Sequence, residues 1–119
     1  MANPNIINVS SVLGKVATQA VGASYTAIVT AATDTIVKIN SLHITNINSS
    51  DLNGAISARI NKSVGTDARI ADEIVVPDAS TLVLISKDSS IYLEEGDSLE
   101  LLANSTSYLE ATCSYEIIS

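Results

Sequence analysis

The 119 residues include 46% hydrophobic side chains but no Phe, no Trp and only four Tyr, so any core must be built from Ile, Val, Leu and Ala. This length suits a single domain, and small β-branched and aliphatic side chains pack well on pleated sheets. Six basic against 13 acidic residues give a formal charge of −7, which would repel a polyanion. No run approaches the roughly 20 apolar residues of a membrane span, and the first residues lack the features of a secretory leader. We therefore expect no nucleic-acid partner, no membrane partner and synthesis in a cytosol-like compartment.

The chain begins with a segment, residues 3–13, that alternates apolar residues with Asn and Ser and ends at Gly14. We expect an extended N-terminal arm over residues 1–14, followed by a β-sandwich domain over 15–119. The arm is too apolar for a free tail, so it is a candidate for partner contact by strand addition to a neighbouring sheet. The alternative is that it forms the first strand of its own sandwich. Its candidate contact residues are Ile6, Ile7, Val9, Val12 and Leu13.

Period-two alternation predicts the next three strands. They are expected over residues 15–21, 24–30 and 35–46. In the third, Val37 and Ile39 are apolar at odd positions, whereas Leu42 and Ile44 are apolar at even positions. A continuous strand cannot change parity without turning its side chains to the other face. A β-bulge near residues 40–41 would return both halves to the core, and we predict one there.

The second half of the chain continues this pattern of short strands and turns. Strands are expected over residues 56–61, 68–76, 81–86, 91–93, 98–103 and 108–118. Ile70, Ile74 and Val76 are predicted to point inward from one strand, and the continuous apolar run 81–86 predicts a strand covered on both faces. Eight or nine short strands with turns about every ten residues predict an all-β fold, an antiparallel two-sheet sandwich of jelly-roll type.

The residues that usually carry chemistry are few. His43 is the only histidine and lies on the strand face opposite its apolar neighbours. Cys113 is the only cysteine, and its alternating apolar context predicts a buried, inert thiol. Glu94, Glu95 and Asp97 could offer oxygen ligands to Ca²⁺, but a solvated hairpin turn explains them better. We therefore expect no catalytic residues, no metal, no cofactor and no enzymatic activity.

The segment from Val75 to Leu101 resembles a group of small virion structural proteins of tailed bacteriophages, particularly those of marine bacteria and cyanobacteria. The resemblance lies in a Val-Pro-Asp-Ala-Ser-Thr-Leu turn, then Ile-Ser-Lys, then Ile-Tyr-Leu-Glu-Glu-Gly-Asp-Ser-Leu. Residues 8–15, 38–42 and 111–116 are similar to the corresponding parts of that group. The resemblance therefore spans nearly the whole chain.

The resemblance implies a non-enzymatic component of the virus particle, made in the host cytoplasm. Small jelly-roll proteins of this size often act as capsid decoration (cement) proteins, which bind the shell of the major capsid protein as trimers over junctions between capsomers. The alternatives are a neck, tail, baseplate or fibre-associated protein of the same virion and, less favoured, a carbohydrate-binding module.

The surface composition bears on how such a protein would dock. Lys and Glu are scarce, whereas Ser, Thr and Ala are abundant, and such surfaces form wide contacts with a small desolvation cost. We expect a homotrimer on this basis. Aromatic residues are frequent interface hot spots, so Tyr25, Tyr92 and Tyr108 are the candidate anchors.

Overall fold

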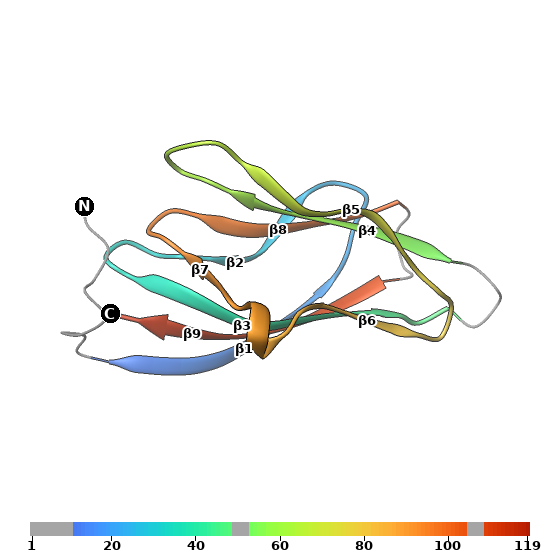
Figure 1. Cartoon of the computed structure of the whole chain (residues 1–119), viewed down its shortest axis with the longest axis horizontal. Helices are drawn as coiled ribbons and strands as arrows, with labels where there is room; N and C mark the ends of the chain where they lie inside the picture. The colour runs from blue at the N-terminus through green and yellow to red at the C-terminus, as the bar shows by residue number, and fades with distance from the viewer. Residues whose placement is uncertain (1–10, 49–52, 105–108) are drawn as a thin grey trace.

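Two antiparallel sheets face each other in the computed structural model, which describes residues 11–48, 53–104 and 109–119 (Figure 1). Sheet A contains β1 (Val12–Ala20), β3 (Ile36–Asn46), β6 (Thr81–Ile85), β7 (Ile91–Leu93) and β9 (Leu109–Ile118). Sheet B contains β2 (Thr26–Thr30), β4 (Gly54–Asn61), β5 (Ala68–Val76) and β8 (Ser98–Ala103). In the described ranges the one helical segment is a 3-10 turn, η2 (Lys87–Ser89).

The order of the strands is that of a jelly roll. Sheet A runs β1-β9-β3-β6, and sheet B runs β2-β8-β4-β5. β7 also pairs with β3, next to the segment of β3 that pairs with β6. β6 and β7 therefore occupy one strand position that η2 interrupts, and the nine strands fill eight positions. The predicted two-sheet sandwich of jelly-roll type is confirmed.

The space between the sheets is filled by aliphatic side chains, as the composition requires. Its largest fully buried members are Ile39, Leu42, Ile44, Ile56, Leu93, Leu99, Leu101 and Leu109. They come from strands of both sheets, so the core is the interior of the sandwich itself.

The predicted bulge in β3 is present. The pairing of β3 with β9 shifts between Ile39 and Ser41, so Asn40 is the extra residue. Val37 and Ile39 on one side of it and Leu42 and Ile44 on the other are all buried. One inserted residue therefore reconciles the change of parity with a single inward face.

β5 differs from the prediction on one face. Ile74, expected inward, is 38% exposed, whereas Ala71 is buried. The pairing of β5 with β4 shifts register twice, and Glu73 has a positive φ of 49°. The side chain of buried Ser57 accepts the N–H of Glu73 at 2.9 Å. A bulge in β5 therefore changes which of its residues point inward. Its free N–H is bonded by a residue of the neighbouring strand, so the sequence of β5 alone does not reveal it.

The apolar run of β6 is not covered on both faces, contrary to the prediction. Val83 is 53% exposed, because β6 is an edge strand of sheet A and its outer face has no layer above it within the described residues. The neighbouring Ile85 is buried. The strand is thus apolar on both sides, of which one packs against the core and the other is exposed at the surface.

The first strand begins earlier than expected. β1 pairs with β9 from Val12 onward, with Leu13 opposite Ile117, and it continues through Gly14 without a break. The last residues of the predicted arm therefore belong to the sandwich. Residues 1–10 lie outside the described part of the chain.

Candidate interface surfaces

Sheet A presents an outer surface whose residues follow from the strand register. Cross-strand rows on this outer face of sheet A are Thr18–Thr112–His43–Val83, Ala20–Glu110–Thr45–Thr81, Val16–Ser114–Ser41 and Gly14–Glu116–Lys38–Tyr92. The inward neighbours of these residues, such as Leu42, Ile44 and Cys113, are buried. The alternation of the strands thus turns the apolar residues inward and gathers hydroxyl groups on the outside.

This face is mild in the sense that it carries few charged side chains. Val16 is 63% exposed, Val83 53% and Tyr92 48%, and Thr45 and Thr81 share a hydroxyl hydrogen bond of 3.1 Å. Hydroxyl and aliphatic groups cost less to remove from water than ionised groups. Part of this face can therefore be removed from water at a small cost.

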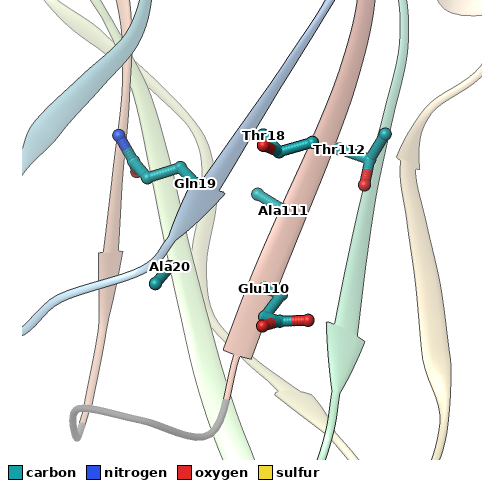
Figure 2. A pocket seen from close by; sticks show the side chains of 6 residues that line it. All are labelled: Thr18, Gln19, Ala20, Glu110, Ala111 and Thr112. Atoms are coloured by element: carbon teal, nitrogen blue, oxygen red, sulfur yellow. The ribbon is translucent and has the colours of Figure 1, made fainter.

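A shallow hollow of about 290 Å³ lies at one end of the face, between β1 and β9. Figure 2 shows its lining residues, Thr18, Gln19, Ala20, Glu110, Ala111 and Thr112. The side chains of Thr18 and Thr112 lie next to each other, whereas Gln19 points to the other side of its strand (Figure 2), where its amide donates to the carbonyl of Ala27 at 3.0 Å. The hollow is lined by one carboxylate and two hydroxyls, and no nucleophile and base are in contact there. We therefore regard it as an ordinary surface depression.

The outer face of sheet B is ionic by comparison. Arg59 on β4 forms an ion pair of 2.7 Å with Glu100 on β8, and Glu100 also accepts from Asn61 at 3.2 Å. The Arg59 guanidinium lies 4.0 Å from the centre of the Tyr25 ring. The hydrogen bond to Glu100 raises the pKa of Arg59 further above its usual value, against the opposing effect of desolvation. The charges of this face are therefore satisfied within the chain.

A second hollow of about 240 Å³ lies on this face. It is lined by Tyr25, Ser57, Arg69, Asp72, Glu73 and Leu102. Arg69 pairs with Asp72 at 2.8 Å, and Tyr25 already stacks against a guanidinium. Sugar binding depends on a free aromatic platform, and here that platform is occupied.

The acidic turn at residues 94–97 is not simply solvated, contrary to the prediction. Asp97 is buried and accepts from Lys62 Nζ at 2.7 Å, from the Ser63 N–H at 3.0 Å and from the Glu94 N–H at 3.1 Å. Gly96 makes the turn possible, because its φ is +86° and an added Cβ would lie 2.9 Å from Ser63. The turn therefore fastens the β4–β5 loop to the start of β8.

The electrostatics of this turn follow from its donors. Burial opposes ionisation of Asp97, but the hydrogen bonds from Lys62 and from the two backbone amides outweigh it and lower the pKa of the carboxyl. The same hydrogen bond raises the pKa of Lys62. Within the described residues no group of three or more His, Cys, Asp or Glu side chains is placed to hold a metal ion. Asp97 is a structural anchor whose oxygens are engaged by protein donors.

The other singled-out side chains lie where strand alternation places them. His43 is exposed on the outer face of sheet A. Cys113 is buried in the core, and that burial raises the pKa of its thiol to about 12. A thiol in this state is neither a nucleophile nor a ready partner for a disulfide.

The predicted contact residues are divided between the two faces. Val12 and Leu13 lie on β1 and are exposed. Tyr92 lies on the outer face of sheet A, and Tyr25 lies on the outer face of sheet B. Ile6, Ile7, Val9 and Tyr108 lie outside the described residues. The structure does not bring Tyr25 and Tyr92 together.

Sequence reasoning missed Val16 and Val83 as surface residues. Val83 lies on β6 opposite His43, and Val16 lies on β1 opposite Ser114, both on the outer face of sheet A. Once the strand bounds and the sheet edges are known, alternation shows that both apolar side chains point outward, and this would have identified them.

These features define a class: a β-sandwich of jelly-roll topology with one mild and one ionic face. No known protein family and no curated protein matches the chain. A solved structure with a similar fold belongs to the Bacillus endospore appendages, described as a novel family of disulfide-linked pili. The TM-score is 0.55 with 11% sequence identity, over 100% of this chain and 96% of that one. At this identity, the likeness concerns the fold alone. Over the described residues, no helix has the length and apolar character to cross a membrane.

Proposed function

We propose that the protein is a non-enzymatic structural subunit of a virus particle, a capsid decoration protein that binds the major capsid protein shell of a tailed bacteriophage. The observation that carries the proposal is the outer face of sheet A, which carries few charged side chains and bears Val16, Val83 and Tyr92 exposed. The resemblance of Val75–Leu101 to small virion proteins supports the placement on a virion. The jelly-roll neighbour found in a pilus supports a role in a multi-subunit assembly.

The physics of cementing a shell fits such a face. A decoration protein must hold shell subunits together by contact alone, and each added interface raises the free energy needed to separate them. Four strand positions spaced by about 4.8 Å and about nine residues of about 3.4 Å give the face an extent of roughly 20 by 30 Å. This is somewhat below the roughly 800 Å² that each partner of a standard interface contributes. Many copies on one shell compensate for a modest single contact.

The contacts of this chain would be non-covalent. The pilus subunits it resembles in fold are described as disulfide-linked, whereas the only cysteine here, Cys113, is buried with its pKa raised to about 12. Docking through the outer face of sheet A requires no thiol.

A neck, tail, baseplate or fibre-associated position in the same virion is the alternative, and the number of copies separates the two. A decoration protein occurs in hundreds of copies per particle, whereas a neck or tail protein occurs in a small ring. The favoured experiment is a quantitative protein gel of purified particles of the virus that encodes the chain. A copy number in the hundreds supports decoration, a dozen or so supports the neck or tail, and absence from the particle contradicts both.

A paired substitution tests the docking face. Val83→Lys places a charge on the outer face of sheet A, on the edge strand β6, where the side chain is 53% exposed and does not enter the core. Ala27→Lys adds the same charge on the outer face of sheet B, opposite Glu100. With particles that lack the protein, we expect Val83→Lys to lose binding and Ala27→Lys to bind as the unmodified chain does. The opposite result would place the docking surface on sheet B.

The homotrimer expected from the surface composition stays a prediction, which sedimentation of the isolated chain and of the particle-bound protein tests. The carbohydrate-binding alternative is weakened by the Arg59 guanidinium on the Tyr25 ring, and binding on a glycan array would restore it.

A further inference from the structure

The four sheet edges of the sandwich differ in how well they are protected against pairing with another strand. An edge strand exposes unpaired N–H and C=O groups, and proteins normally block it with bulges, charges, proline or very short strands. Three of the edges carry such protection. The fourth, β1, does not.

The protected edges each use a different device. The edge formed by β6 and β7 is interrupted by η2. β2 has five residues and a register shift, and its Ala27 carbonyl accepts from the Gln19 side chain. β5 has two register shifts, carries Arg69, Asp72 and Glu73, and is followed by Pro77.

β1 is long and regular by contrast. Its nine residues pair with β9 without a register shift, and the strand contains no proline and a single charge, Lys15. Val12, Leu13 and Val16 are each more than half exposed. Among the described residues, no strand pairs with its outer edge.

The alternation of hydrogen-bonded pairs between β1 and β9 determines which backbone groups of β1 point to its outer edge. Ser11 exchanges both N–H···O bonds with Ser119 at 3.1 Å, and the Val21 N–H donates to the Leu109 carbonyl at 3.0 Å. Odd residues of β1 therefore bond to β9, and the even residues between them point away, because the two kinds of pair alternate along an antiparallel ladder. Within the described residues, the donors and acceptors that point away from β9 are those of Val12, Gly14, Val16, Thr18 and Ala20.

We infer that this edge is a self-association site, at which β1 pairs with β1 of a second copy of the chain around a two-fold axis. The strand is complementary to itself in a register centred on Val16. Val16 then lies opposite the partner's Val16, Gly14 opposite the partner's Thr18, and Val12 opposite the partner's Ala20. The free edge groups of both copies meet in this register and form about ten main-chain hydrogen bonds.

Charge selects this register over its neighbour. Moving the centre to Lys15 would place two ammonium groups directly opposite each other, and like charges in that position are destabilising. In the register centred on Val16, Lys15 lies opposite the partner's Ala17 instead. The pairing also closes on itself, since each copy uses the one edge that is unprotected within the described residues, so it gives a dimer and not a filament.

Dimerisation would extend the outer face of sheet A across the axis. The even residues of β1 belong to that face, so the two faces would join with Val16 of each copy at the seam. Each single face is roughly 600 Å² from its strand spacing, and the joined face exceeds the share of a standard interface. The inference does not depend on what the joined face binds.

Sedimentation of the full chain tests the dimer. We expect a mass twice the 12.4 kDa of the chain at high concentration. Val16→Lys should restore the monomer, because it opposes two charges at the axis on a side chain that is 63% exposed in the single copy. Val83→Lys is the matched control on the same sheet and should remain dimeric. A wild-type monomer at the highest soluble concentration, the homotrimer expected from the surface composition, or equal mass for the two variants would overturn the inference.

Cysteine cross-linking tests the register. In the proposed pairing the two Val16 Cα atoms lie about 5.5 Å apart, within the range of a disulfide, so Val16→Cys should form an oxidised dimer. Thr18 lies four residues, about 13 Å along the strand, from its own counterpart, so Thr18→Cys should not. Cys113 is buried and does not interfere. Cross-linking of Thr18→Cys as readily as Val16→Cys would contradict the register.

The two sets of variants separate this inference from the proposed function. Loss of particle binding in Val83→Lys with an intact dimer supports both. A dimer that does not bind particles contradicts the proposed function alone, whereas a monomer that binds particles contradicts the dimer alone.

Discussion

The outer faces of the two sheets come from the same alternating pattern but have opposite chemistry. On sheet B, Arg59 and Glu100 pair at 2.7 Å and Arg69 and Asp72 at 2.8 Å. On sheet A the cross-strand rows contain Thr, Ser and Val together with a few charged residues, Lys38, Glu110 and Glu116. The comparison shows that a face whose charges are matched within the chain has few groups left to offer a partner. A face of hydroxyl and methyl groups is easier to dehydrate.

The largest disturbance of this comparison would be deletion of Asn40. That residue is the bulge of β3, and without it one half of the strand must turn its side chains over. Either Val37 and Ile39 or Leu42 and Ile44 would then point to the outer face of sheet A. We expect no cooperative thermal transition and no dispersed NMR spectrum from the deletion variant.

The control for this prediction keeps the residue and changes its side chain. Asn40→Ala preserves the count of residues in the bulge, so it should fold and lose little stability. A deletion variant that melts cooperatively near the temperature of the unmodified chain would show that the bulge is dispensable.

This bulge is also where the sequence was most informative. The change of parity between Ile39 and Leu42 lies within one strand, and alternation alone exposes it. The bulge of β5 was missed, because its cause is the hydroxyl of Ser57 on the neighbouring strand. Local patterns therefore identify irregularities within a strand, but they miss those that depend on a strand brought in from elsewhere in the chain.

Sheet B should depend on charge for its stability where sheet A does not, and Asp97→Asn tests this. The substitution removes the ionised partner of Lys62 and leaves a buried amide with fewer acceptors. We expect a loss of about 2–3 kcal/mol in the free energy of unfolding, the range for a hydrogen bond to a charged group. Asp88→Asn, at an exposed acid, should lie within about 0.5 kcal/mol of the unmodified chain. Urea unfolding measures both.

The same side chain predicts how stability depends on acid. The pKa of Asp97 is lowered in the folded protein, so its contribution is fully present above the unfolded value of about 3.9. That contribution is lost as the pH falls through the lower folded value. We expect the free energy of unfolding to fall in this acidic window, with a shallower slope in Asp97→Asn. Equal slopes for the two proteins would assign the acid sensitivity to other carboxylates.

The anchoring role of Asp97 could not be predicted, because two of its three donors lie more than thirty residues away. Lys62 and Ser63 reach it only once the β4–β5 loop is folded over the turn at Gly96. Composition and spacing showed three acids in a turn and no more. In the same way, the outward Val16 and Val83 become a shared surface only when β1 and β6 take their places in one sheet.

A smaller effect is expected inside sheet A, at Cys113. The thiol is buried in an apolar setting, so Cys113→Ser places a hydroxyl there at a cost of about 1–2 kcal/mol. Because burial raises the pKa of the thiol to about 12, the native protein should not react with a thiol reagent at pH 8, and the unfolded protein should. Rapid labelling of the native chain would show that the sheets open more readily than their packing indicates.

The smallest change to the fold, and the sharpest test of the two faces, is the removal of one tyrosine from each. Tyr92→Ala removes a side chain that is 48% exposed on the outer face of sheet A, so stability should hardly change. Particle binding should weaken about tenfold or more, as for an aromatic hot spot. Tyr25→Ala removes the ring under the Arg59 guanidinium, so a slight fall in Tm is expected while binding stays intact. If Tyr25→Ala weakens binding and Tyr92→Ala does not, the ionic face is the one that docks, and the ease of dehydrating hydroxyl and methyl groups does not decide which surface a partner uses.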